Sequence, residues 1–365
     1  MVEPWKLTRQ REESDTTMNK ISFQPFEFQG KAGEYFRIWI VNVCLTIISV
    51  GLYSPWAKIR QKRYFYGSTH LAGATFDYVA NPWAILKGRL IAVALVIVFG
   101  TIIHFLPGAE RIFWLAFIIA LPWLTIRTLR FNAVNTVYRN IRFNFTGAYK
   151  QAFVYFALGP FFLVPLSLGL AQPWSKRGQM KLIVDNSFYG KTAFNLGATI
   201  GDFWVFYRRV GLGFIAVAFL FGVSLALLIP HTEPTAAGVN NAVMGQAMAF
   251  IPLLLLLWIA PLWVYLNVMI SNLIWSKTSI KGISFRSELK FWPMFVLYIS
   301  NILGIIFSFG LLIPWAKIRI TRYRLSCMGL CCTEEELKGF VAGQVEIVGA
   351  FGEELSDILD VDIGL

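Results

Sequence analysis

Long uncharged stretches separated by short basic ones dominate the chain. Seven apolar segments stand out, at residues 38–57, 90–106, 112–126, 151–175, 210–229, about 247–275 and 291–316. A helix of about 20 apolar residues crosses a hydrocarbon core of ~30 Å. The hydrophobic pattern therefore predicts an all-α polytopic membrane protein.

One ten-residue motif occurs in three of these segments, as GLYSPWAKIR at 51–60, GLAQPWSKRG at 169–178 and GLLIPWAKIR at 310–319. Proline ends or kinks a preceding helix, tryptophan favours the membrane–water boundary, and lysine and arginine suit anionic headgroups. We interpret the motif as a membrane exit signal. Its candidate interface and lipid-headgroup residues are Pro55, Trp56, Lys58, Arg60, Pro173, Trp174, Lys176, Pro314, Trp315, Lys317 and Arg319.

Short pieces with strand-like alternation precede the three motif-bearing segments. They read FEFQG at 26–30, FNFTG at 143–147 and ISFRS at 283–287, and residues 64–80 suit a small hairpin. The spacing from the second Phe of each piece, or the single Phe of the third, to the motif proline is 27, 28 and 29 residues. This constancy predicts tandem repeats. Their expected bounds are 23–142, 143–282 and, for a partial third repeat, 283–330, between a disordered tail at 1–22 and an acidic cytosolic tail at 331–365.

The basic residues favour one of two topologies. Every connection between apolar segments is rich in Lys and Arg except two, 107–111, which has only Arg111, and 230–248, which has none. Basic loops stay on the cytoplasmic side. If the motif-bearing segments dip into the bilayer and return, all basic loops lie inside; if they span, some face outward. We therefore prefer four spanning helices plus three re-entrant segments to seven spans. Both termini are then cytoplasmic, and Asn42, Gly159-Pro160 and Gly304 are expected near the re-entrant tips.

Composition agrees with a membrane location. Of 365 residues, 56% are hydrophobic and 15% charged, and mean hydropathy is +0.57. The net charge of +12 is gathered at the ends of apolar segments, which indicates contact with anionic lipid headgroups rather than nucleic acid. No signal peptide is predicted before the first apolar segment. The four cysteines have neither a disulfide framework nor a metal-ligand pattern.

No pattern of a catalytic site is present. The chain has three dispersed histidines and no nucleophile triad, phosphate loop or dinucleotide fingerprint. We therefore expect no enzyme activity, cofactor or metal. The candidate ligand-binding residues are Arg127 and Arg130, which share a helix face at the end of segment 112–126. They lie within the bilayer if that helix is long, or at its cytosolic end if the apolar part stops early.

Several longer strings resemble a known family. EYFRIWIVN at 34–42, SPWAKIR at 54–60, RYFYG at 63–67, FDYVANPWAILKGRL at 76–90 and FGEELSDILDVDIGL at 351–365 resemble the YjgN-like family of bacterial inner-membrane proteins. The resemblance covers nearly the whole chain from about residue 22. It implies a multi-pass protein of the inner membrane of Gram-negative bacteria, and it implies no catalytic residue, substrate or cofactor.

Repeated, interrupted apolar segments without catalytic residues favour a transport or binding role. The leading hypothesis is passage or binding of a small solute, ion or lipid within the repeat bundle. One alternative is a scaffold or adaptor whose acidic tail recruits a protein partner. A second alternative is a lipid-modifying membrane enzyme that assembles its site from scattered residues.

Overall fold

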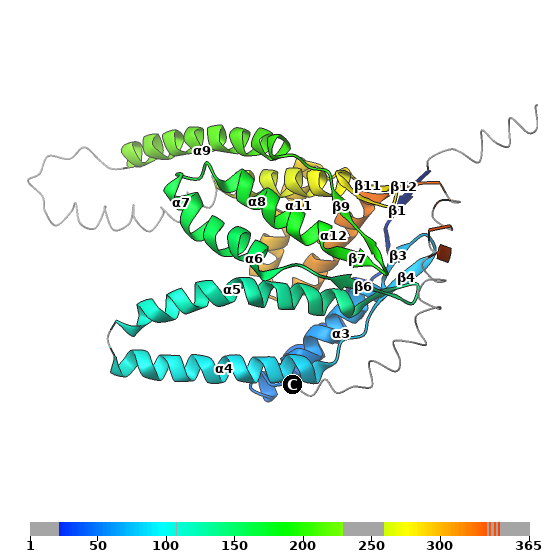
Figure 1. The fold of residues 1–365 in the computed structure, drawn as a ribbon, viewed down its shortest axis with the longest axis horizontal. Helices are drawn as coiled ribbons and strands as arrows, with labels where there is room; N and C mark the ends of the chain where they lie inside the picture. Colours follow the sequence, from blue (N-terminus) through cyan, green and yellow to red (C-terminus); the bar gives the residue numbers. More distant parts are fainter. Residues whose placement is uncertain are drawn as a thin grey trace, which may run out of the picture.

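The strands of the molecule gather at one end, and the helices extend from them in one direction (Figure 1). This computed structural model describes residues 22–106, 108–228, 259–333, 336, 339–340 and 342–343. The predicted tail at 1–22, apart from Ser22, and most of the predicted acidic tail lie outside the described residues. The expected outer loop at 230–248 also lies outside them.

The described chain consists of five consecutive units, each made of a strand, a helical pair and a second strand. The first is β1 (Ser22–Pro25) and β2 (Glu27–Phe28), α2 (Ala32–Ile48), α3 (Ser54–Gly67) and β3 (Thr69–Leu71). The second is β4 (Ala74–Tyr78), α4 (Pro82–Phe105), α5 (Ala109–Val134) and β5 (Thr136–Tyr138). The third is β6 (Ile141–Phe145), α6 (Tyr149–Ala152), the π-helix η1 (Phe153–Leu163), α7 (Val164–Leu166), α8 (Gln172–Asp185) and β7 (Ser187–Tyr189).

The fourth unit is β8 (Thr192–Ala193) and β9 (Asn195–Leu196), α9 (Ile200–Leu228), a helix at Ile259–Ser276 and β10 (Thr278–Ile280). The fifth is β11 (Ile283–Ser287), α11 (Phe291–Phe307), α12 (Ile313–Ser326) and β12 (Met328–Cys332). The strand-like pieces expected from the sequence are thus real, but they belong to a larger β structure than predicted.

The strands close into an antiparallel barrel. One sheet has the order β1-β12-β11-β10-β9 and the other β2-β3-β4-β5-β6-β7-β8. Single residues, Phe26 and Phe194, join β1 to β2 and β8 to β9, so both sheets continue into each other at both edges. The N–H of Phe26 donates to Met328 at 3.0 Å and that of Phe194 to Ser187 at 3.0 Å. A closed ring leaves no free sheet edge.

Side-chain hydroxyls form hydrogen bonds at four of the junctions between a second helix and the strand that follows it. The hydroxyls of Thr69, Thr136, Ser187 and Thr278 each donate to the carbonyl four residues earlier, at 2.6 to 2.8 Å. These bonds satisfy carbonyls that have no partner within the helix. After the strand, both residues of the turn Lys281-Gly282 have positive φ (44° and 90°), as in the type I′ turns that match the strand twist.

The three motifs lie at the tips of the three short helical pairs, where each runs from the end of the first helix into the second. The N–H of Gly51, with φ of 86°, donates to the carbonyl of Thr46 at 2.7 Å and ends α2. Pro55 then lies in the first turn of α3, where its missing N–H costs nothing. Gly169 with Pro173 and Gly310 with Pro314 repeat this geometry.

Four helices in the described part of the chain are long and apolar enough to cross a membrane: Pro82–Phe105, Ala109–Val134, Ile200–Leu220 and Ile259–Ser276. They belong to the second and fourth units. The helical pairs of the other units are shorter. The apolar side chains at their tips are exposed: Val50, Leu168 and Phe309 are 91%, 94% and 98% exposed. The expected breaker Asn42 is instead buried within α2, and Gly304 lies inside α11.

Polar side chains of one unit donate hydrogen bonds to backbone carbonyls of a neighbouring unit. Arg322 on α12 donates to the carbonyl of Gly30 at 2.9 Å, and Arg177 on α8 donates to that of Ala198 at 3.1 Å. Asn272, on the helix at 259–276, donates to the carbonyl of Leu289 at 2.8 Å. All three acceptors lie four residues after a phenylalanine of a first strand. The bond of Arg322 joins the fifth unit to the first, where the pairing of β1 with β12 completes the barrel.

Candidate functional site

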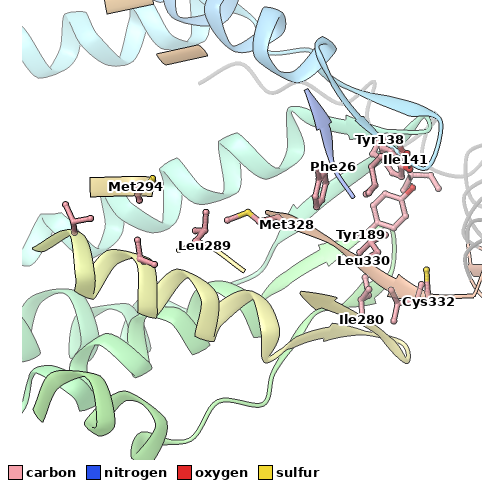
Figure 2. Packing of buried hydrophobic residues seen from close by; sticks show 14 residues of the cluster. Phe26, Tyr138, Ile141, Tyr189, Ile280, Leu289, Met294, Met328, Leu330 and Cys332 are labelled. Atoms are coloured by element: carbon pink, nitrogen blue, oxygen red, sulfur yellow. Dashed lines mark hydrogen bonds between the residues drawn. The ribbon is translucent and has the colours of Figure 1, made fainter. Parts of the chain in front are cut away.

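The interior of the barrel is the best-defined site. Each first strand contributes one phenylalanine to it: Phe26, Phe76, Phe143, Phe194 and Phe285. Each second strand contributes a large side chain next to its turn or end: Leu71, Tyr138, Tyr189, Ile280 and Leu330. Figure 2 shows part of this layer, with Tyr138 and Tyr189 close together and Leu330 in the same buried cluster. Alternation along the strands places these side chains on the inner face.

Eight aromatic side chains form an unbroken ring of contacts around the interior. In order, they are Phe26, Phe76, Tyr138, Tyr189, Phe143, Phe194, Phe285 and Trp275, which returns to Phe26. Neighbouring ring centroids are 4.6 to 6.4 Å apart, within the usual range for aromatic pairs. Trp275 is the member that comes from a helix. We call this set the aromatic ring.

The aromatic ring borders a cavity of about 640 Å³. With β1–β2 and β8–β9 each counted as one continuous strand, ten strands enclose a wider interior than the eight that side chains can fill. The cavity also reaches the last turns of the second helices, where Phe65, Ile183 and Ile274 line it. Among the described residues that line the cavity, none is Asp, Glu, Lys, Arg or His. The site is therefore a largely apolar chamber that extends to the last turns of the second helices.

The polar atoms of the chamber are satisfied by the protein itself. The hydroxyl of Tyr138 donates to the carbonyl of Leu71 at 2.7 Å, and that of Tyr189 donates to the carbonyl of Tyr138 at 3.1 Å. Burial raises the pKa of both tyrosines, because it disfavours the phenolate. Both stay neutral near pH 7. A ligand in the chamber thus meets no free charge and few free donors.

A segment after the barrel reaches the same chamber. Glu336 and Thr333 form a capping box: the carboxylate accepts from the N–H of Thr333 at 2.9 Å, and the N–H of Glu336 donates to the Thr333 hydroxyl at 3.1 Å. The helical residue Phe340 follows, and its ring stacks on Tyr189 with centroids 5.8 Å apart. Phe340 lines the cavity.

The structure places Arg127 and Arg130 on α5, outside the chamber. Both are exposed. The guanidinium of Arg127 lies 5.2 Å from the ring centre of Trp123, one helical turn earlier. Nε of Arg130 donates to the carbonyl of Phe145 at 3.2 Å and thereby joins the second unit to the third. Their observed contacts are within the protein.

The motif residues lie on three separate helical pairs, and a fourth, unrecognised copy of the motif lies in α5. The buried prolines Pro55, Pro122, Pro173 and Pro314 each lie fourteen residues before the first residue of the strand that follows. Residues 121–127 read LPWLTIR, which matches SPWAKIR in the first unit. This match could have revealed the second unit as a repeat. The equivalent position of the fourth unit is the buried Val264.

The motif's tryptophan and arginine form a stacked pair. The guanidinium of Arg319 lies 4.3 Å from the ring centre of Trp315, the same arrangement as Arg127 on Trp123. Arg319 also donates to the side chains of Ser300 and Asn301, each at 3.2 Å. In the first unit Lys58 and Arg60 are exposed, whereas Trp56, Lys176, Lys317 and Trp174 are half-buried. The motif cations are not gathered into one site.

The aromatic ring itself was missed by sequence reasoning. Phe76 and Phe194 lie in strands that were not recognised as equivalents of FEFQG, FNFTG and ISFRS. The signal is a phenylalanine four residues before the end of a short alternating piece that follows a turn, as in ATFDYVA and TAFNLGA. Helical pairs of different length separate the pieces, so their spacing along the chain is irregular.

Comparisons with known proteins identify relatives in bacterial membranes. The family described as "Bacterial protein of unknown function (DUF898)" matches residues 23–358. The inner membrane protein YjgN of Salmonella typhimurium is 32% identical over 145 residues, which are 39% of this chain and 37% of that protein. YjgN of Escherichia coli O157:H7 is 33% identical over 131 residues, or 34% and 32% of the two chains. The match thus spans about a third of these relatives. No solved structure matches.

Proposed function

This chain belongs to the bacterial DUF898 family, and from its membrane-protein character we propose that its barrel binds the apolar chain of a membrane lipid. The observation that carries the proposal is the uncharged cavity of about 640 Å³ inside the aromatic ring. Ligand pockets commonly measure about 300–1,000 Å³ and are mostly apolar. The chamber has both properties.

The chemistry of the lining favours a lipid chain over the ion or polar solute that the sequence also allowed. An ion needs charged or carbonyl ligands, and a polar solute needs free hydrogen-bond partners. The part of the lining that the structure describes has no charged residue, and the hydroxyls of Tyr138 and Tyr189 already donate hydrogen bonds to backbone carbonyls. A methylene group transferred from water into such a site gains about 0.8 kcal/mol. Binding then grows with the length of chain that fits.

We further propose that the barrel lies at the cytoplasmic face, with the second and fourth helical pairs spanning the membrane. Each of the three short pairs would insert only its tip. This arrangement is supported by the shared position of Pro55 and Pro122: Arg60 then lies level with Arg127, where the apolar stretch of α5 ends. The exposed tip residues Val50, Leu168 and Phe309 extend beyond that level and suit hydrocarbon.

At this level the motif cations would contact anionic headgroups, which is the partner we propose for them. Lys58 and Arg60 are exposed where the apolar stretch of the neighbouring long helix ends. Lysine and arginine near the cytoplasmic surface each gain roughly 1 kcal/mol from anionic lipid. A lipid whose chain enters the chamber from the helical end would leave its polar end on this side. We propose binding without catalysis, and neither a cofactor nor a metal is part of the proposal.

The test is photo-crosslinking in lipid nanodiscs with a fatty acid that carries a diazirine in its chain. Adducts are mapped to peptides by mass spectrometry. We expect adducts on the strands that carry Phe76, Phe143 and Phe285. Adducts confined to the exposed faces of the membrane helices would contradict the proposal, because they report ordinary bilayer contact.

A matched pair of variants distinguishes lipid bound in the chamber from lipid in contact with the protein surface. Ser187→Phe places a large ring in the cavity lining, whereas Ser284→Phe places the same ring on the exposed face of β11. Strand adducts should fall in the first variant and persist in the second. If strand adducts are absent from the full-length protein but appear after deletion of residues 344–365, that segment, and not a lipid chain, occupies the chamber.

A further inference from the structure

The chamber has two different ends. Each second strand runs from a helix to a turn, so Thr69, Ser187 and Thr278 mark the helical end of the cavity. Tyr138 and Tyr189 immediately precede turns and mark the opposite end. The helical end is lined by the last helical turns. An apolar chain that enters from the membrane must therefore point its tip toward the turn end.

Phe340 lies at that turn end. Its ring stacks on Tyr189 with an interplanar angle of 30° and packs against the buried cluster of the barrel. Its position is set by a short, defined connection, because the capping box of Thr333 and Glu336 begins directly after β12. Phe340 follows seven residues after Thr333 and lines the cavity.

From this geometry we propose that Phe340 is the end stop of the chamber and sets the length of the lipid chain that it accepts. This inference rests on the lipid-binding function proposed above. A chain that fits would end against the Phe340 and Tyr189 rings. A chain that is too long would have to displace Phe340 or leave methylenes outside the helical end. One methylene beyond the fit typically costs an apolar pocket about tenfold in affinity.

The composition of the turn end supports a stop rather than a passage. The hydroxyls of Tyr189 and Tyr138 donate in sequence to the carbonyls of Tyr138 and Leu71, which holds three neighbouring second strands together at this level. Phe340 stacks on the ring of Tyr189, which belongs to this hydrogen-bonded group. A single side chain thus sets the depth of the cavity, and changing its size should change this depth while the strand residues of the lining stay the same.

The experiment measures how saturated fatty acids of increasing chain length displace a fluorescent fatty acid from the full-length protein in nanodiscs. The wild type should show a cutoff length beyond which affinity falls roughly tenfold per step. Phe340→Ala should move the cutoff to longer chains and Phe340→Trp to shorter ones. Phe23→Ala, which removes a ring that is 44% exposed on the outside of β1, should leave it in place.

The outcomes distinguish this inference from the function beneath it. A fluorescent fatty acid that binds, with one cutoff shared by the wild type, Phe340→Ala and Phe340→Trp, would overturn the end-stop role while keeping the lipid site. No binding by the folded wild-type protein would overturn both. Because the two variants are expected to shift the cutoff in opposite directions, a general loss of stability cannot imitate the predicted result.

Discussion

The backbone N–H of Gln29 donates to the carbonyl of Ser68 at 2.9 Å, although two helices separate these residues along the chain. The first helical pair therefore begins and ends at the same place. Because Phe28 also lies opposite Thr69 in the antiparallel ladder, the pair cannot have its two ends on opposite sides of a bilayer while this barrel is intact. Each of the other units returns to the barrel in the same way.

This relationship predicts that the helix–strand junctions are inaccessible to a reagent on the periplasmic side. Single cysteines at Ser68, Ser187 and Ala236 are introduced into a cysteine-free protein and exposed to a membrane-impermeant thiol reagent from the periplasmic side. Only Ala236 should react, because Ser68 and Ser187 both belong to helix–strand junctions of one barrel. Permeabilised cells provide the control for reactivity. Labelling of Ser68 or Ser187 in intact cells would contradict the proposed topology.

The contact between the first and fifth units should be stabilised by Arg322. Arg322→Ala removes the bond to the carbonyl of Gly30 and leaves that acceptor without its charged donor. Hydrogen bonds to charged groups contribute about 1.5–3 kcal/mol, so the free energy of unfolding should fall by this amount. The measurement is chemical denaturation in detergent, together with limited proteolysis of the β1–β12 junction.

Arg286→Ala is the matched control for this prediction. Arg286 forms an ion pair with Glu288, but both side chains are about 60% exposed, and such pairs contribute about 0–1 kcal/mol. Equal losses of stability in Arg322→Ala and Arg286→Ala would show that the bond between Arg322 and Gly30 stabilises the barrel no more than an exposed ion pair does.

Much of the helical framework was predictable from the sequence, because membrane helices are marked by length and apolarity alone. The four expected spanning segments correspond to the four long apolar helices of the described chain, and the motif-bearing segments to short helical pairs. The motif was harder to place. Gly51 and Pro55 both read as helix terminators, and only the structure shows that one ends a helix while the other begins the next.

The barrel could not be predicted from the same patterns. Its strands are two to five residues long, so each carries only one or two inward side chains. Their pairing joins residues that are far apart along the chain, such as Ser22 with Cys332, and local periodicity holds no information about such pairs. The site residues predicted from the sequence were chosen for their charge and lie on α5 and in the motifs. The chamber is built from uncharged residues such as Phe76 and Phe194.

The buried amide of Asn301 should stabilise the fifth helical pair. Asn301 is 3% exposed; its Nδ2 donates to the carbonyl of Ala316 at 3.4 Å, and its Oδ1 accepts from Arg319 at 3.2 Å. Asn301→Ala removes both hydrogen bonds, while Arg319 keeps its bond to Ser300, and should lower the free energy of unfolding by about 1–3 kcal/mol. Thermal denaturation in detergent measures the loss.

Two further variants test whether the loss comes from this bond. Asn195→Ala removes an exposed amide from β9 and should change stability by less than about 0.5 kcal/mol. The double variant Asn301→Ala, Arg319→Ala should lose less than the sum of the two single variants, because the residues share one bond. Strict additivity would mean that Asn301 and Arg319 do not interact.

Alkaline pH should weaken the barrel through its buried tyrosines. Burial raises the pKa of Tyr78 to about 12, whereas an unfolded tyrosine titrates near 10. Below pH ~10 the phenol is neutral in both states, and between pH ~10 and 12 only the unfolded state loses the proton, so the free energy of unfolding falls as pH rises. For two pKa units the fall is up to about 2.7 kcal/mol.

Denaturation at pH 8 to 12 should show a flatter decline in the free energy of unfolding for Tyr78→Phe than for the wild type. Tyr149→Phe, at an exposed position outside the barrel, should keep the wild-type slope. The comparison uses slopes, because Tyr78→Phe also removes the hydroxyl bond to Asn132 and lowers stability at every pH. Equal slopes in the wild type and Tyr78→Phe would show that Tyr78 ionises in the folded barrel as readily as in the unfolded chain.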